Sequence, residues 1–242
     1  MEFGLIIVGD EILSGRRRDG HLTAVIERLN ARGLGLDWCR IVGDREDHLV
    51  ATLRETMATG ASVFCCGGIG ATPDDVTRQA AASAAGVALA RHPEGEALLR
   101  ARFGDSASDL RLRMVDFPAG AELIPNPVNQ VPGFRVGEHH FVPGFPDMAW
   151  PMIEWVLDTR YQAYLRTPRA THSIRVVARE SDLIPLLERL GRDHPEVRFS
   201  SLPDMSGSDY AVELGVTGAP EEAGTAQQAL AAELDAAGVQ RA

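Results

Sequence analysis

The segment from Cys66 to Thr77 constrains the fold more than any other part of the sequence, because it joins a glycine turn to two adjacent carboxylates. Its sequence is Cys-Gly-Gly-Ile-Gly-Ala-Thr-Pro-Asp-Asp-Val-Thr, and it follows a short apolar run at 61–66 that is typical of a buried strand. A helical pattern begins at Val76, so we expect the glycines near the N-terminus of a helix. Free backbone amides and absent side chains at such a place favour a bound phosphate.

The neighbouring carboxylates Asp74 and Asp75 indicate whether a cation would accompany that phosphate. Carboxylates beside an anion site repel a phosphate unless a divalent cation bridges them, which implies Mg²⁺ or a similar hard ion. A purely structural interpretation also stands, because Asp is an ordinary helix cap and Gly-Gly turns often follow strands.

Two further acidic turns follow predicted strands. The apolar run Leu5–Val8 leads into Gly9-Asp10-Glu11, and the strand predicted at 36–42 leads into Asp44. Because ligands of open parallel sheets bind at the carboxyl ends of the strands, we expect these turns to face one pocket. For Asp44 an ordinary turn position is the alternative.

The first two-thirds of the chain alternate between strand and helix patterns. Strands predicted at 4–8, 36–42 and 62–66 alternate with helices that follow Asp19 and Asp47, the two expected N-caps. This order indicates right-handed βαβ units and a three-layer, doubly wound, mostly parallel sheet.

A hairpin is predicted at 135–142, before the turn that begins at Pro143. Its second strand carries His139 and His140. Adjacent side chains of a strand point to opposite faces, so we expect one of these histidines to be exposed and the pair not to be a metal site.

A boundary is predicted at Thr167-Pro168-Arg169, which divides the chain into domains 1–167 and 168–242. The second has a β-α-β-β-α pattern, with one strand beginning at Tyr210, and is expected to form a small two-layer α+β subdomain. The polar residues Ser200, Ser201, Asp204, Ser206 and Ser208 are expected in turns.

The composition of the 242 residues excludes several classes of protein. The formal net charge of −10 argues against binding a nucleic-acid backbone. No apolar run approaches the ~20 residues of a membrane span, and the first residues lack a basic signal region, so a cytoplasmic protein is expected. The three cysteines, Cys39, Cys65 and Cys66, lie in predicted strands and are expected to be reduced.

Four separated motifs together resemble the MoaB/Mog molybdopterin-binding domain family over about residues 3–165. They are Gly9-Asp10-Glu11 with Ser14-Gly15, Val42-Gly43-Asp44, Gly67 to Thr77, and Pro143-Gly144-Phe145-Pro146. The closest branch is the N-terminal part of CinA (competence/damage-inducible) proteins, and the same domain precedes the synthase part of eukaryotic FAD synthases. Cys66, Ile69 and Phe145 differ from the Thr, Thr and Asn of Mog-type enzymes. We expect no deamidase activity, since the domain that carries it in many CinA proteins is not matched.

The resemblance implies that the chain binds, and hydrolyses, a nucleotide diphosphate such as ADP-ribose or FAD. The expected cofactor is Mg²⁺, Co²⁺ or Mn²⁺, with K⁺ as an accessory ion, and relatives imply a homo-oligomer, either a dimer or a trimer. The alternative is a protein that binds or adenylylates molybdopterin in molybdenum cofactor biosynthesis.

The predicted site follows from these motifs. Asp75 is expected to be the principal metal-linked residue, helped by Asp74, with Asp44 and Asp10 as further metal ligands. Phe145 is expected either to stack on a ring of the ligand or to pack in the core. The full set expected to contact ligand or phosphate is Asp10, Glu11, Ser14, Gly15, Gly67, Gly68, Gly70, Thr72, Thr77, Asn126, Pro143, Gly144 and Phe145.

Overall fold

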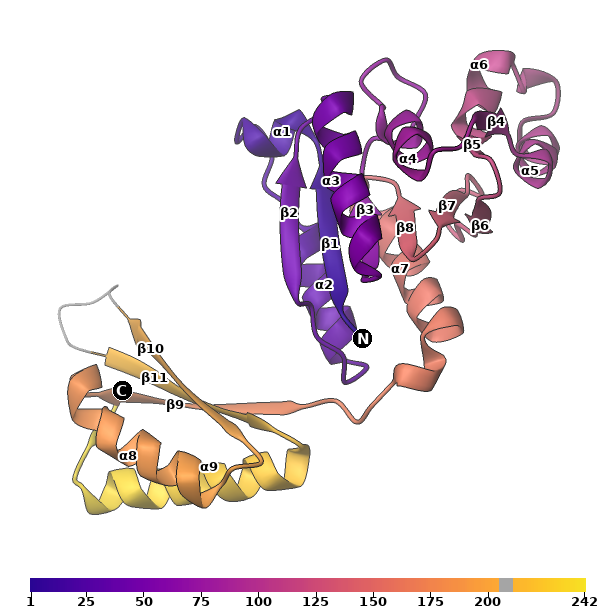
Figure 1. Cartoon of the computed structure of the whole chain (residues 1–242). Coiled ribbons are helices and arrows are strands. Elements are labelled where there is room, and N and C mark those ends of the chain that lie inside the picture. Colours follow the sequence, from indigo (N-terminus) through magenta and orange to yellow (C-terminus); the bar gives the residue numbers. More distant parts are fainter. Residues whose placement is uncertain (205–210) are drawn as a thin grey trace. The chain divides into compact units, whose positions relative to one another are not determined.

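The computed structural model describes residues 1–204 and 211–242. They form two compact units, one of Met1–Asn30 with Leu34–Leu165 and one of Ala31–Gly33 with Arg166–Ala242 (Figure 1). Within the described ranges, no helix combines the length and the apolar character needed to cross a bilayer.

The first unit is built on a six-stranded sheet with the order β2-β1-β3-β8-β7-β6 (Figure 1). Neighbours among β2, β1, β3 and β8 pair in parallel, whereas β7 is antiparallel to both of its neighbours. The predicted mostly parallel sheet is therefore confirmed. The strands are β1 (Phe3–Val8), β2 (Trp38–Val42), β3 (Ser62–Cys66), β6 (Glu122–Ile124), β7 (Gly133–Val136) and β8 (His139–Val142).

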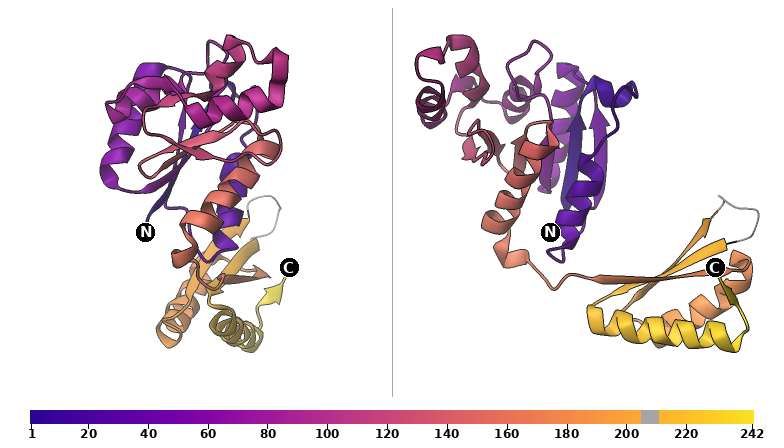
Figure 2. Two further views of the ribbon diagram at one scale, coloured as in Figure 1. Left: turned by 90° about the vertical axis from the view of Figure 1, so that its right-hand side faces the viewer. Right: turned by 180° about the vertical axis from the view of Figure 1, so that it is seen from behind.

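Alternate side chains of the central strands enter two separate cores, one on each face of the sheet. Ile6 and Cys65 belong to the core that includes residues of α3, α4 and α5, and Ile7 and Phe64 to the core that includes α2 and α7. Seen from behind, α2 and α7 cover the face opposite α3 (Figure 2). The three layers are as predicted. The helices are α2 (His21–Asn30), α3 (Glu46–Thr59), α4 (Thr77–Ala85), α5 (Pro93–Phe103) and α7 (Pro146–Arg160).

The beginnings of two helices test the predicted caps. Asp19 accepts hydrogen bonds from the amides of His21 and Leu22, both at 2.9 Å, and so caps α2 as predicted. The prediction for Asp47 is wrong, because α3 begins at Glu46, two residues before the predicted start, and Asp47 is already inside the helix. Asp47 lies in the first turn of α3, where the helix dipole favours a carboxylate, and it pairs with Arg45 at 2.7 Å.

Three stacked phenylalanines connect the strand β5 (Asp116–Pro118), which is not part of the six-stranded sheet, to that sheet. The ring centroids of Phe117 and Phe134 are 4.6 Å apart, and those of Phe134 and Phe141 are 4.5 Å apart. All three side chains are buried, so the stack fixes β5 and β7 against β8. The remaining elements of this unit are α1 (Asp10–Leu13), β4 (Leu89–Arg91), α6 (Asp109–Leu112), β5 (Asp116–Pro118) and 3-10 turns at Gly104–Ser106, Arg113–Val115 and Gln162–Tyr164.

His139 and His140 are both buried, so the prediction that one of them is exposed is wrong. The reason is that both faces of β8 are covered, one by α3, which contributes Thr56, and the other by α7 and the residue after it, Tyr161. His139 Nε2 pairs with the Thr56 hydroxyl at 2.8 Å, and His140 Nε2 with the Tyr161 hydroxyl at 2.6 Å. Burial lowers the pKa of His139 to about 4 and that of His140 to about 3, so both are neutral at pH 7.

The second unit is a four-stranded antiparallel sheet with the order β10-β11-β9-β12 and two helices that share its core. This confirms the predicted small α+β subdomain and adds the short strand β12. Ser200, Ser201 and Asp204 lie in the strand β10 (Arg198–Asp204), so their predicted turn positions are wrong. Ser206, Ser208 and Tyr210 lie outside the described residues. The elements are β9 (Ala170–Val177), α8 (Glu180–Asp193), β10 (Arg198–Asp204), β11 (Ala211–Gly218), α9 (Pro220–Ala236) and β12 (Gln240–Arg241).

Candidate functional site

A cleft of about 440 Å³ lies at the carboxyl ends of β1, β3 and β8. The turns after these strands begin at Gly9, Gly67 and Pro143, and all three residues line the cleft. A parallel sheet places its ligand sites at this edge, as the sequence suggested. The other lining residues are Val8, Glu11, Arg17, Asp44, Gly68, Ile69, Gly70, Ala71, Thr72, Asp74, Asp75, Met114, Asn126, Asn129, Val131, Pro132, Gly144, Phe145 and Met148.

The glycines of the central turn are required by close backbone contacts. Gly67 has a φ of 113°, and a Cβ there would lie 2.3 Å from the carbonyl oxygen of Val8. At Gly144, a Cβ would lie 3.3 Å from the Cα of Gly67. The turns after β3 and β8 therefore approach each other backbone to backbone, which leaves the cleft wall without side chains at this point.

Thr77 holds this turn in place through two hydrogen bonds. Its hydroxyl donates to the carbonyl of Gly67 at 2.9 Å, and its amide donates to the carbonyl of Gly68 at 3.0 Å. The side chain is fully buried and is absent from the cleft lining. The structure thus gives Thr77 a positioning role instead of the expected contact with ligand. The first amide of α4 also has a partner in the protein and is not offered to an anion.

Arg78 is a positioning residue that the sequence motifs did not identify. The side chain is 4% exposed, and its guanidinium donates to the carbonyl of Gly70 at 2.7 Å and to those of Arg113 and Asp116. Burial lowers its pKa, while the Asp116 carboxylate acts in the opposite sense. It joins the end of the glycine turn to the segment before β5. An Arg at the start of an alanine-rich helix carries no signal of this contact, since such positions are normally solvated.

The Asp75 carboxylate is held by the loop that precedes it. Its Oδ2 accepts from the Thr72 amide at 2.8 Å and from the Thr72 hydroxyl, and it packs so closely on Gly70 that a Cβ there would lie 2.4 Å away. A hydroxyl has one proton, and that of Thr72 goes to Asp75. Thr72 thus orients the Asp75 carboxylate, in addition to lining the cleft.

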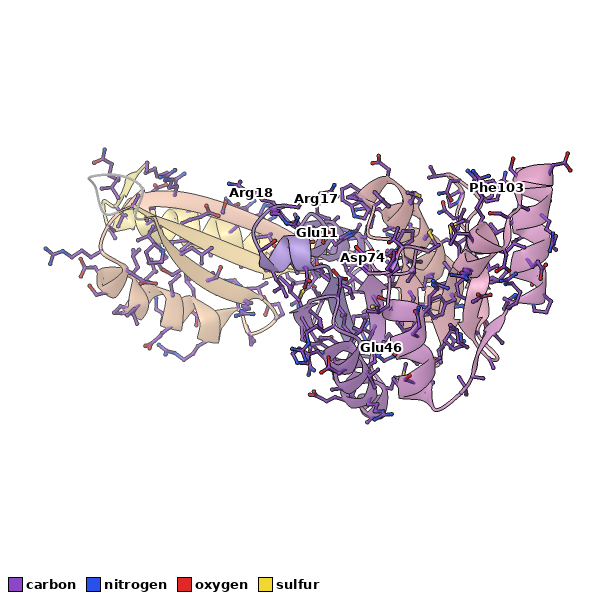
Figure 3. The ribbon with its side chains drawn as sticks, turned by 90° about the horizontal axis from the view of Figure 1, so that it is seen from above. Glu11, Arg17, Arg18, Glu46, Asp74 and Phe103 are labelled. Atoms are coloured by element: carbon purple, nitrogen blue, oxygen red, sulfur yellow. The ribbon has the colours of Figure 1, made fainter. Side chains whose placement is uncertain are left out.

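Asp10 and Asp44 bind each other's backbone across the β1 and β2 turns. The Asp10 amide donates to Asp44 Oδ2 at 2.8 Å, and the Asp44 amide donates to Asp10 Oδ1 at 3.2 Å. The pKa of Asp44 is raised, first by burial and then by the carboxylates of Asp10, Glu11 and Asp74. Negative charge is therefore concentrated at this end of the cleft. Figure 3 shows Glu11, Arg17 and Asp74 at this edge, and Arg17 is the single basic side chain among the described residues that line the cleft.

The positions of the carboxylates show how a metal ion of the predicted kind could be held. Across residues 1–204 and 211–242, no three His, Cys, Asp or Glu side chains are grouped to hold a metal ion. The expected ligands are divided, with Asp10 and Asp44 bound to each other's backbone and Asp75 bound to Thr72. Mg²⁺ is usually held by one or two carboxylates together with substrate phosphates and water. These oxygen donors fit a cation that arrives with a phosphate-bearing ligand.

The other end of the cleft is lined by amides and apolar side chains. Asn126 lines it and is buried, and its Oδ1 accepts from the amides of Val128 and Asn129 at 3.0 and 3.3 Å. Phe145 is 59% exposed and also lines the cleft, so it is not a core residue.

Four residues of the predicted set do not line the cleft: Asp10, Ser14, Gly15 and Thr77. Ser14 and Gly15 follow α1, and neither lines the cleft, although both are exposed. The Ser14 hydroxyl accepts from Arg16 Nε at 3.3 Å. Arg17, two residues after Gly15, lines the cleft instead.

The fold and the cleft define a class: three-layer α/β domains whose ligand cleft lies at the carboxyl ends of parallel strands. Residues 4–163 match the family model described as "Probable molybdopterin binding domain", and residues 168–242 match the one described as "FAD synthase, middle domain". The chain belongs to the molybdopterin-binding domain family, as the sequence motifs predicted.

Individual relatives agree with this assignment. A protein of Pyrobaculum calidifontis is 30% identical over 210 residues, which cover 82% of this chain and 79% of that protein. A CinA-like protein of Koribacter versatilis is 32% identical over 204 residues, which cover 82% of this chain but 45% of the relative. The crystal structure of CinA from Thermoplasma acidophilum, described as of unknown function, matches 65% of this chain and 98% of its own with 26% identity and a TM-score of 0.59. The chain thus spans under half of the CinA-like relative from Koribacter.

Proposed function

We propose that the cleft binds a nucleotide diphosphate of the ADP-ribose or FAD type and hydrolyses its pyrophosphate with the help of a divalent cation. One observation carries the proposal: a backbone wall of glycines and a group of four carboxylates, Glu11, Asp44, Asp74 and Asp75, line the same cleft. Glycine turns accommodate phosphate oxygens, whereas carboxylates in the same cleft call for a cation between them and the phosphate.

The roles of the chain's own residues follow from their contacts. Thr72 holds Asp75 in one orientation through two hydrogen bonds, and Arg78 holds the glycine turn from behind. Asp75 would then orient a cation or an attacking water, with Asp74 beside it. A divalent cation bound here would polarise a phosphoryl oxygen and lower the pKa of a bound water. Arg17 supplies positive charge at the mouth of the cleft.

The family assignment supports the choice of substrate class. The second unit matches a model described as the middle domain of FAD synthase, and it directly follows the molybdopterin-binding domain. A dinucleotide such as FAD has the pyrophosphate and the ring that this cleft would accommodate. The alternative, binding or adenylylation of molybdopterin, uses the same phosphate wall and rests on the description of the first domain.

The test is hydrolysis of ADP-ribose and of FAD with Mg²⁺, Mn²⁺ or Co²⁺, with and without K⁺. The reaction is measured as the release of AMP. Asp75→Asn keeps an oxygen that can accept from Thr72, so it should fold normally and lose metal-dependent turnover. Asp105→Asn is the matched control, because Asp105 is exposed and lies outside the cleft lining; it should behave as wild type.

Turnover that survives in Asp75→Asn would reject the assigned role of that carboxylate. Absence of turnover in folded wild-type protein, together with tight binding of a pterin phosphate, would select the alternative. The expected homo-oligomer can be measured on the same samples by light scattering after size-exclusion chromatography.

A further inference from the structure

The loop between β6 and β7 contains a buried hydrogen-bond donor without an acceptor. Asn126 is 4% exposed, and among the described residues its Nδ2 has no hydrogen-bond partner. Buried polar groups are nearly always paired, and leaving such a donor without an acceptor destabilises the folded state. Because Asn126 lines the cleft, a ligand that fills this end can supply the missing acceptor.

The carbonyl oxygen of the same side chain is already used. Asn126 Oδ1 accepts from two backbone amides, those of Val128 and Asn129. The side chain can therefore offer the ligand its donor but not its acceptor.

Asn129 has the same arrangement. Its Oδ1 accepts from the Val131 amide at 2.9 Å, while its Nδ2 donates to the Met148 sulfur at 2.8 Å. A thioether is a weak acceptor, so a better one on the ligand can replace it. Both amide side chains at this end thus present donors alone.

The surroundings fit a flat ring. Met114, Val131, Pro132 and Met148 line this part of the cleft, and the exposed face of Phe145 is available for stacking. The carboxylates and glycines lie in the same cleft, so a ligand can place its phosphates against them and its ring against the amides.

We propose that this end selects a heterocycle whose edge consists of hydrogen-bond acceptors, as in an isoalloxazine, a pterin or a 6-oxopurine, over the amino edge of adenine. The proposal rests on the proposed function, since it names the ring of the nucleotide ligand. An Asn with both groups free pairs with adenine through N6 and N7, which requires its acceptor. Asn126 and Asn129 lack a free acceptor, whereas the adjacent O6 and N7 of an oxopurine, or a flavin carbonyl, match their donors.

The first experiment compares the α,β-methylene analogues of ADP-ribose and inosine diphosphate ribose by calorimetry, using the full chain with Mg²⁺, because the methylene bridge prevents hydrolysis during the titration. The two ligands differ at the purine edge and share the phosphates and sugars. We expect the inosine ligand to bind roughly tenfold more tightly, the size of one good base contact. FMN and inosine monophosphate, titrated separately, distinguish an isoalloxazine from an oxopurine as the preferred ring.

Asn126→Asp tests the residue itself. The carboxylate keeps an oxygen for the Val128 and Asn129 amides but replaces the donor by an acceptor, so the preference should shift towards ADP-ribose. Gln130→Glu is the matched control, because Gln130 is exposed and does not line the cleft, so the change adds the same charge to the same loop while the Asn126 and Asn129 donors stay in place; it should leave the ratio unchanged. Circular dichroism and thermal melting confirm that both variants fold.

Each result either supports the proposal or overturns it. A preference for the inosine ligand that inverts in Asn126→Asp alone supports the proposal. Equal affinities in wild type, or equal changes in both variants, overturn it while leaving the proposed function intact. If neither ligand binds, the proposed function fails first, and the inference with it.

Discussion

Thr77 gives the sharpest test of how the structure assigns roles, because the sequence predicts a ligand contact and the structure shows an internal hydrogen bond. Thr77→Val keeps the β-branched shape and removes the hydroxyl that donates to Gly67 at 2.9 Å. Since Thr77 and Gly67 are both buried, the Gly67 carbonyl is left without that partner. The loss should be about 1–3 kcal/mol, reduced slightly by the added methyl group. For a unit of this size that lowers the melting temperature by roughly 2–10 °C.

The assay can be confined to the first unit. All three tryptophans, Trp38, Trp150 and Trp155, belong to it, so tryptophan fluorescence follows its unfolding without a signal from the second unit. Thr77→Ser is the control, because it keeps the hydroxyl and loses one methyl group, worth about 1 kcal/mol. Ligand affinity is measured well below the melting temperatures of all three proteins. If Thr77→Val melts like wild type but loses affinity for nucleotide, Thr77 contacts the ligand and its positioning role is refuted.

Three other changes test separate parts of the molecule. Burial and neighbouring carboxylates raise the pKa of Asp44, so its ionised form is disfavoured on folding. Asp44→Asn should therefore raise the urea midpoint at pH 7, and the gain should disappear as the pH falls through the range in which carboxyl groups titrate. A midpoint equal to that of wild type at both neutral and acidic pH would contradict this. The pKa values of His139 and His140, about 4 and about 3, lie below that of an unfolded His, about 6.5, so stability should fall as pH drops from about 6.5 to 4, by up to about 1.4 kcal/mol per pH unit for each His. His139→Gln should flatten that slope in the same urea titrations, and an equal slope would count against burial as the cause. Phe145→Ala should change the free energy of unfolding by no more than about 0.5 kcal/mol, since the side chain is 59% exposed. It should weaken the affinity for a ligand with an aromatic ring by roughly tenfold in calorimetry. Ribose 5-phosphate, which has no aromatic ring to stack, is the control ligand.

Local and periodic features were predictable from the sequence alone. The strand runs, the Asp19 cap and the acidic turns after strands depend on residues close together in the chain, and a parallel sheet brings such turns to one edge whatever the details of packing. The motifs were also sufficient to indicate the family, which the match over residues 4–163 confirms.

Only the tertiary structure decided what each polar side chain does. Thr77 reaches back ten residues to Gly67, and Arg78 reaches the carbonyls of Arg113 and Asp116, 35 and 38 residues away. Asp10 pairs with Asp44 across 34 residues, whereas Asp75 is held by Thr72. Burial of both His139 and His140 depends on the helices that cover the two faces of β8 and bring Thr56 and Tyr161 to them. Hydrogen bonds and burial of this kind arise when distant segments pack together, and neither composition nor spacing specifies which donor meets which acceptor.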